Sequence, residues 1–116
     1  MITMENAIPD TYLAKIFGPE KAANLLKKYF VDLGQKLDML TKCLEEKNMP
    51  GIRKIAHQLK GSGKSYGFEH ITEVGIALSS FAKQDDYPGL EEVINDLGNH
   101  IIKQGRIVSD WGKIEY

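Results

Sequence analysis

The chain has 116 residues, of which 42% are hydrophobic and 27% are charged, as expected of a soluble folded domain and not of a disordered chain. The formal net charge is −1, so the overall charge does not point to a nucleic acid or a membrane surface, and any electrostatic recognition must be local. The single cysteine, Cys43, excludes an intramolecular disulfide, and no signal peptide or membrane-spanning apolar run is visible. We therefore expect one cytoplasmic domain over residues 1–116.

Apolar residues recur every three or four positions along most of the chain, the pattern of amphipathic helices. The first predicted helix is short, from about Asp10 to Phe17, and ends at Gly18. The second is long, from about Pro19 to Lys47, and Pro19 suits its first turn. One apolar stripe continues along it for about five turns; it consists of Leu26, Phe30, Leu33, Leu37, Leu40 and Leu44.

The rest of the chain predicts three further helices and no strand, because no window alternates with period two. One begins near Pro50, with Asn48 as a candidate N-cap, and stops at Gly67; the next runs from about Glu69 to Lys83. The last runs from about Pro88 to Ser109, and we expect Trp111 to cover the end of the bundle. The predicted fold is all-α: an antiparallel (up-down-up-down) four-helix bundle with a short extra N-terminal helix.

Several glycines fall inside the predicted helices, where each costs about 1 kcal/mol relative to alanine. We interpret them as points of close helix packing. They are Gly34, Gly63, Gly75, Gly98 and Gly105.

The helix that begins near Pro50 has two different sides. On a helical wheel its apolar side is formed by Ile52, Ile55, Ala56, Leu59, Gly63 and Tyr66. The opposite, outward side carries His57 together with Arg53, Lys60, Gly61 and Lys64. No Asp or Glu occurs between Pro50 and Phe68, so this side is locally positive in a chain of slightly negative charge.

The outward side suits chemistry on a phosphoryl group. A free imidazole is mostly neutral at pH 7, so one ring nitrogen keeps a lone pair and is a competent nucleophile. Lys60 and Lys64 are placed to neutralise phosphoryl oxygens, and Gly61 leaves bare backbone for a partner to approach. The competing interpretation is a solvated histidine among solvated basic residues, and the residues alone leave both open.

Residues 56–68, AHQLKGSGKSYGF, resemble the signature of histidine-containing phosphotransfer (HPt) domains, written A-H-x-L-K-G-S, a small residue, two variable residues, then an apolar residue and Gly. The resemblance implies a phosphorelay intermediate: His57 would accept a phosphoryl group from a phospho-aspartyl receiver domain and pass it to another response-regulator receiver. It further implies a phosphocarrier, not an enzyme, with no cofactor of its own, because the receiver supplies Mg²⁺ and catalysis. The implied partners are receiver domains of response regulators and hybrid sensor histidine kinases, and we expect a monomer.

The chain departs from the family at one position. Many members have a Gln or Glu about 22 residues after the histidine that can orient the imidazole, and here that position is Ser79. Ser80 or a water is a possible substitute. Apolar candidates for docking beside His57 are Leu13, Phe17 and Phe68, although each also suits the core.

Two rival functions have different signatures. A helical docking or inhibitor module for a sensor kinase or receiver would need the surface but not the nucleophile. An ATP-dependent kinase would need a nucleotide motif, and KGSGKS has one residue, not four, between its first Gly and the Gly-Lys pair. The spacing of His70, His100 and Cys43 also fits no metal-ligand motif, so we expect no metal site.

Overall fold

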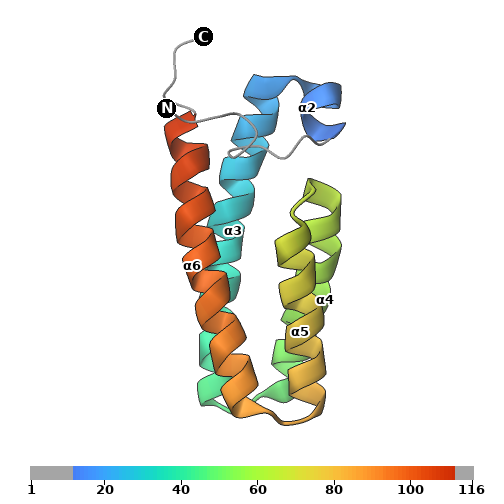
Figure 1. Ribbon diagram of the computed structural model, residues 1–116, viewed down its shortest axis with the longest axis vertical. Coiled ribbons are helices and arrows are strands. Elements are labelled where there is room, and N and C mark those ends of the chain that lie inside the picture. Colours follow the sequence, from blue (N-terminus) through green and yellow to red (C-terminus); the bar gives the residue numbers. More distant parts are fainter. Residues whose placement is uncertain (1–11, 112–116) are drawn as a thin grey trace.

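The computed structural model describes the backbone of residues 12–111 and the side chains of residues 15–105. Its helices are α2 (Tyr12–Phe17), α3 (Pro19–Glu45), α4 (Met49–Tyr66), α5 (Glu69–Lys83) and α6 (Tyr87–Trp111). α3 to α6 run up and down as an antiparallel bundle, which confirms the predicted fold class (Figure 1).

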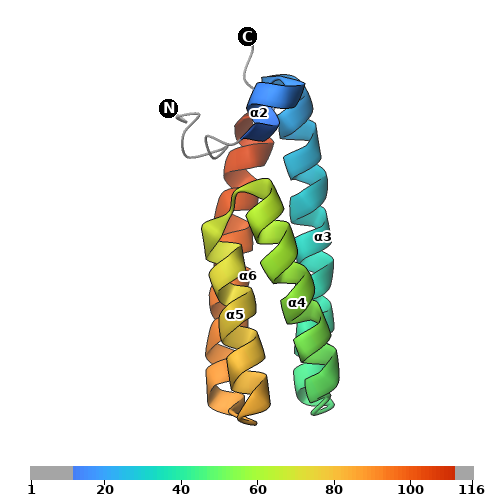
Figure 2. The ribbon, with the colours of Figure 1, turned by 90° about the vertical axis from the view of Figure 1, so that its right-hand side faces the viewer.

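The four long helices differ in how far they extend. α3 and α6 continue beyond the turn that joins α4 to α5, and the short α2 lies at this extended end, as both ribbon views show (Figures 1 and 2). α6 begins one residue earlier than predicted and continues to Trp111. The side chains of Leu13 and Trp111 lie outside the described residues.

The ends of α4 follow directly from local sequence signals. The Asn48 Oδ1 atom accepts a hydrogen bond from the Gly51 amide at 3.0 Å, and Pro50 occupies the first turn. At the other end Gly67 has a φ of 82°, in the left-handed region that glycine adopts without strain. The next amide, that of Phe68, donates to the Gly63 carbonyl at 2.8 Å and closes the helix.

The core is apolar throughout, and within the described part of the chain no polar or charged side chain is buried. Its largest fully buried side chains are Leu26, Leu33, Leu40, Ile52, Leu59, Ile71, Leu78, Leu90 and Leu97. Each contributes about 1.5–3 kcal/mol by burial. Of the stripe predicted on α3, Leu37 and Leu44 are only partly buried. Among the described helices, none is both long and apolar enough to cross a membrane.

The helix glycines have different surroundings. Close packing is confirmed where α4 meets α5: a Cβ on Gly63 would lie 2.6 Å from the Thr72 amide nitrogen, and one on Gly75 would lie 2.7 Å from the Ala56 carbonyl. The same prediction is wrong for Gly34, where an added Cβ would meet no described atom within 4 Å, and for Gly105 no close contact is seen among the described residues. At Gly98 an added Cβ would make only an ordinary contact with Leu37, at 3.4 Å.

Candidate functional site

His57 lies in the middle of α4 and is exposed, as the helical wheel predicts. Arg53, Gly61 and Lys64 are also exposed, and Lys60 is half-buried. The core side of the same helix is buried at Ile52, Ile55, Ala56, Leu59 and Gly63, with Tyr66 half-buried. We call the group His57, Arg53, Lys60, Gly61 and Lys64 the basic face.

Within the described residues, no acidic side chain neutralises the positive charge of the basic face. α4 contains no acidic residue. Over residues 15–105, the ion pairs are Lys36–Asp32 and His70–Asp96. No carboxylate of this region lies within 4.0 Å of the charged groups of Arg53, Lys60 or Lys64. The cations of the basic face are therefore free to meet an anion brought by a partner.

Gly61 has no structural role that its surroundings reveal. A Cβ at this position would meet no atom of the described residues within 4 Å, so this part of the fold would accept a larger residue. A glycine here costs α4 about 1 kcal/mol relative to alanine. What the glycine provides is bare helix backbone one turn from His57, where another protein can approach closely.

Lys60 differs from the other cations because α5 fixes its base. A Cβ on Gly75 would lie 2.7 Å from the Lys60 Cγ and 2.9 Å from the Lys60 amide nitrogen. The Thr72 hydroxyl donates to the Lys60 carbonyl at 3.5 Å. The first part of this side chain therefore lies against α5, while Arg53 and Lys64 stand in solvent.

Ser62, the serine of the signature, points away from the basic face towards α3. Its Oγ lies 3.1 Å from the Tyr29 hydroxyl. The Tyr29 ring stacks on Tyr66, with centroids 4.2 Å apart. Burial raises the pKa of Tyr29 from 10.0 to about 12. Ser62 thus holds α4 to α3.

Ser79 lies on the part of α5 that faces α4. The contacts Gly63–Thr72 and Lys60–Gly75 fix the antiparallel register of the two helices, and one further turn along α5 brings Ser79 level with His57. Ser79 is half-buried, and among the described side chains no hydrogen bond joins it to His57. Ser80 is exposed and accepts a hydrogen bond from Gln84 at 3.2 Å.

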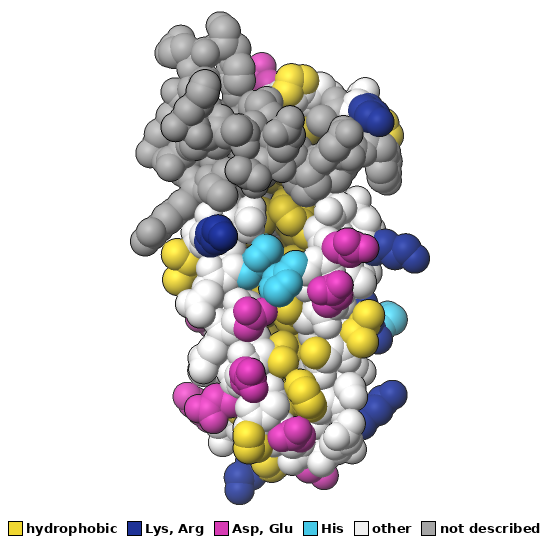
Figure 3. Space-filling view, in the orientation of Figure 1, with side chains coloured by type: hydrophobic (Ala, Val, Ile, Leu, Met, Phe, Trp, Pro, Cys, Tyr) yellow, Lys and Arg dark blue, Asp and Glu magenta, His cyan; other side chains and the backbone are white. Residues whose placement is uncertain are grey.

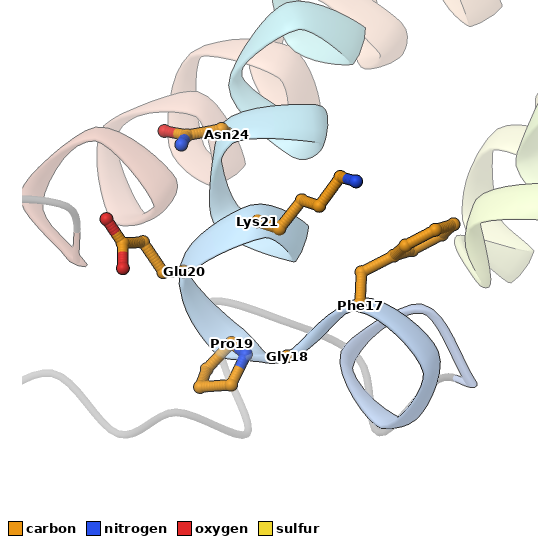
Figure 4. Close-up of a pocket in the computed structure, with 6 residues that line it drawn as sticks. All are labelled: Phe17, Gly18, Pro19, Glu20, Lys21 and Asn24. Atoms are coloured by element: carbon orange, nitrogen blue, oxygen red, sulfur yellow. The ribbon is translucent and has the colours of Figure 1, made fainter.

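The apolar residues predicted as docking candidates differ in their burial. Phe68 is 7% exposed and lies edge-on against Phe30, which confirms the core alternative for this residue and not the docking one. Phe17 is exposed, with the Lys21 ammonium 5.1 Å from its ring centroid, and it lines an open groove at the junction of α2 and α3 (Figure 4). Leu13 lies outside the described side chains.

Ile76 of α5 is a candidate docking residue that was not predicted from the sequence. This side chain is 55% exposed although it is apolar. It follows Gly75 and comes four residues after Thr72, so it lies on the side of α5 that borders the basic face. The signal was present, because Ile76 falls outside the buried stripe of Ile71, Val74 and Leu78.

The other two histidines form a separate cluster between α5 and α6. The rings of His70 and His100 have centroids 4.4 Å apart, and His70 Nε2 lies 2.9 Å from the Asp96 Oδ2. Figure 3 shows the histidine pair with acidic side chains around it. Burial, and then the neighbouring His70, lower the pKa of His100, whose Nε2 is buried and finds no hydrogen-bond partner among the described side chains. In the part of the chain with described side chains, no group of three or more His, Cys, Asp or Glu residues is arranged to hold a metal ion.

Comparison with known protein families identifies the chain. The family model for the Hpt domain matches residues 24–104, which include all of α4 and α5 and most of α3 and α6. The chain therefore belongs to the Hpt domain family. Hpt domains carry phosphoryl groups on histidine in two-component phosphorelays, interact with receiver domains and are not catalytic enzymes. No curated protein and no solved structure gave a significant match.

Proposed function

We propose that His57 accepts a phosphoryl group from a phospho-aspartyl receiver domain and passes it to another response-regulator receiver. The observation that carries this proposal is the difference between the three histidines. His57 is exposed on a face without acids, whereas His70 is paired with Asp96 and the Nε2 of His100 is buried. A nucleophile for a macromolecular donor needs an open approach, and His57 offers one.

The chemistry needs little from this chain. A ring nitrogen of neutral His57 attacks phosphorus, an N–P bond forms, and the P–O bond to the aspartyl carboxylate breaks with its electrons leaving on oxygen. The second ring nitrogen keeps its N–H through the step. Lys60 and Lys64 offset the charge on the phosphoryl oxygens. The step is reversible because the aspartyl carboxylate and the imidazole are both good leaving groups. In this proposal the receiver supplies Mg²⁺ and the acidic pocket, and this chain binds no cofactor.

The remaining residues of the site are proposed to serve docking, or, for Ser79, the orientation of the imidazole. Arg53 extends the positive charge one turn before His57, and Gly61 allows close approach on the other side. Ile76 provides exposed apolar area beside these charges, which suits a partner surface that is apolar at its centre and acidic at its rim. Ser79 is placed at the level of the imidazole and is proposed to orient it through a water.

The test is intact mass after the protein is mixed with receiver domains charged by a small phosphodonor and Mg²⁺. We expect a gain of one acid-labile phosphoryl group in the wild type and none in His57→Gln. The matched controls His70→Gln and His100→Gln should be labelled like the wild type. Labelling of His57→Gln would place the acceptor elsewhere.

The rival docking module predicts a different pattern. Receivers would bind the wild type and His57→Gln equally well, and neither protein would be labelled by any receiver in a panel. That result would reject the phosphocarrier proposal, because an inhibitory surface needs no nucleophile.

A further inference from the structure

α5 approaches α4 closely at Gly75, beside the helical turn that follows His57. At Gly75 an added Cβ would lie 2.7 Å from the Ala56 carbonyl oxygen, 2.7 Å from the Lys60 Cγ and 2.9 Å from the Lys60 amide nitrogen. Two of these atoms belong to backbone, which cannot move aside as a flexible side chain can. Any residue but glycine would therefore displace α5 from the turn that carries His57 and Lys60.

Lys60 is held at this point from two directions. Its Cγ lies against Gly75, and its carbonyl accepts a hydrogen bond from the Thr72 hydroxyl, 3.5 Å away. Residues three apart on a helix are neighbours, so Lys60 and His57 lie side by side. The part of the Lys60 side chain nearest the backbone is thus fixed by a second helix, and only its outer part is left to move.

We propose that Gly75 is a positioning residue for phosphoryl transfer, which acts by holding Lys60 against α5 beside His57. This inference rests on the proposed function of His57. A lysine whose inner bonds are already restricted loses less freedom when its ammonium meets the phosphoryl oxygens. The contribution of Gly75 therefore appears in the rate of the transfer step, not in receiver affinity.

The decisive experiment is a double-mutant cycle on single-turnover transfer from a phosphorylated receiver at saturating concentration. Gly75→Ala should lower the rate about tenfold with the half-saturating receiver concentration little changed, as for a group misplaced near the reacting atoms. In the Lys60→Ala background the same Gly75→Ala change should lower the rate less than twofold, because the residue on which Gly75 acts is gone.

A purely structural role for Gly75 predicts other results. Equal losses in both backgrounds, or no loss in either, would overturn the inference. The matched control is Val74→Ala, which removes a side chain that is 3% exposed in the core from the neighbouring position of α5. It should lower stability and leave the transfer rate of the folded protein within twofold of wild type.

A second variant covers the case in which Gly75→Ala does not fold. Thr72→Val removes the hydrogen bond to the Lys60 carbonyl with no added bulk, and it should slow transfer two- to threefold in the wild-type background only. A loss of the same size in the Lys60→Ala background would again overturn the inference. If the wild type itself is never labelled, the proposed function fails; if it is labelled and both cycles show no coupling, only this inference fails.

Discussion

The hydroxyl groups of Tyr29 on α3 and Ser62 on α4 lie 3.1 Å apart and link the phosphotransfer signature to the opposite helix. Ser62 also reaches the Leu59 carbonyl at 3.4 Å, so its hydroxyl is satisfied on both sides. The signature segment therefore combines residues of the proposed site with a residue that stabilises the packing of α4 on α3. His57, Lys60 and Gly61 form the proposed site, and Ser62 attaches the helix that carries it to α3.

Tyr29→Phe is expected to lower the free energy of unfolding by about 0.5–1.5 kcal/mol, the range for one hydrogen bond between neutral groups. The ring and its stack on Tyr66 remain, so transfer to His57 should be unchanged. Urea denaturation measures the first quantity and single-turnover labelling the second. A variant as stable as the wild type would show that the Ser62 contact contributes nothing.

Alkaline pH provides an independent test of the burial of Tyr29. Its folded pKa is raised from 10.0 to about 12, so the folded state keeps a proton that the unfolded state releases between these values. Stability from this group is fully present below pH 10 and is lost as the pH rises towards 12. Over this pH window, the melting temperature of the wild type should fall more steeply than that of Tyr29→Phe.

Gly61→Ala should change stability and function in opposite directions. Because an added Cβ meets nothing within 4 Å, alanine should stabilise α4 by about 0.5–1 kcal/mol. Receiver binding should weaken, and Gly61→Gln should weaken it further. The control is Gly34→Ala on α3, equally open, which should stabilise the protein and leave receiver binding unchanged. Unaltered binding by Gly61→Gln would remove Gly61 from the docking surface.

Ile76→Ala is expected to raise the receiver concentration at half-saturation about three- to tenfold, because burial of an apolar side chain in an interface is worth roughly 1 kcal/mol or more. The transfer rate at saturation should not change. Val31→Ala on α3 is the comparison, because Val31 is also exposed, at 64%. Equal effects of the two variants would argue against a specific role for Ile76.

The histidine cluster between α5 and α6 predicts acid sensitivity. The pKa of His100 is lowered from its ordinary 6.5 by burial and by His70, with Asp96 acting in the opposite sense and Lys103 in the same sense. The unfolded chain therefore binds a proton at this residue before the folded protein does, and stability falls as the pH drops below about 6.5. Melting temperatures of His100→Leu, measured from pH 7.5 to 5, should depend less on pH than those of the wild type.

Much of the fold was open to prediction because it depends on local rules. The period of the apolar residues located each helix, Asn48 and Gly67 marked the ends of α4, and the wheel placed His57 outside. The contact of Lys60 with Gly75 was not predictable, because it depends on the register between two helices that periodicity does not fix. For Phe68 the sequence offered both the core and docking, and the course of the α4–α5 turn, which no helix stripe fixes, decides for the core.

The exposure of His57 has a consequence for how partners are told apart. His57 is exposed on the outer side of α4 and does not lie in a pocket formed by the described residues. The shape of the site therefore excludes few partner proteins. Under the proposed function, we therefore expect discrimination between receivers to come from a few side chains around the imidazole, such as Arg53, Lys64 and Ile76, none of which belongs to the core. We therefore expect that surface substitutions can change which receiver this bundle binds while its free energy of unfolding stays almost the same.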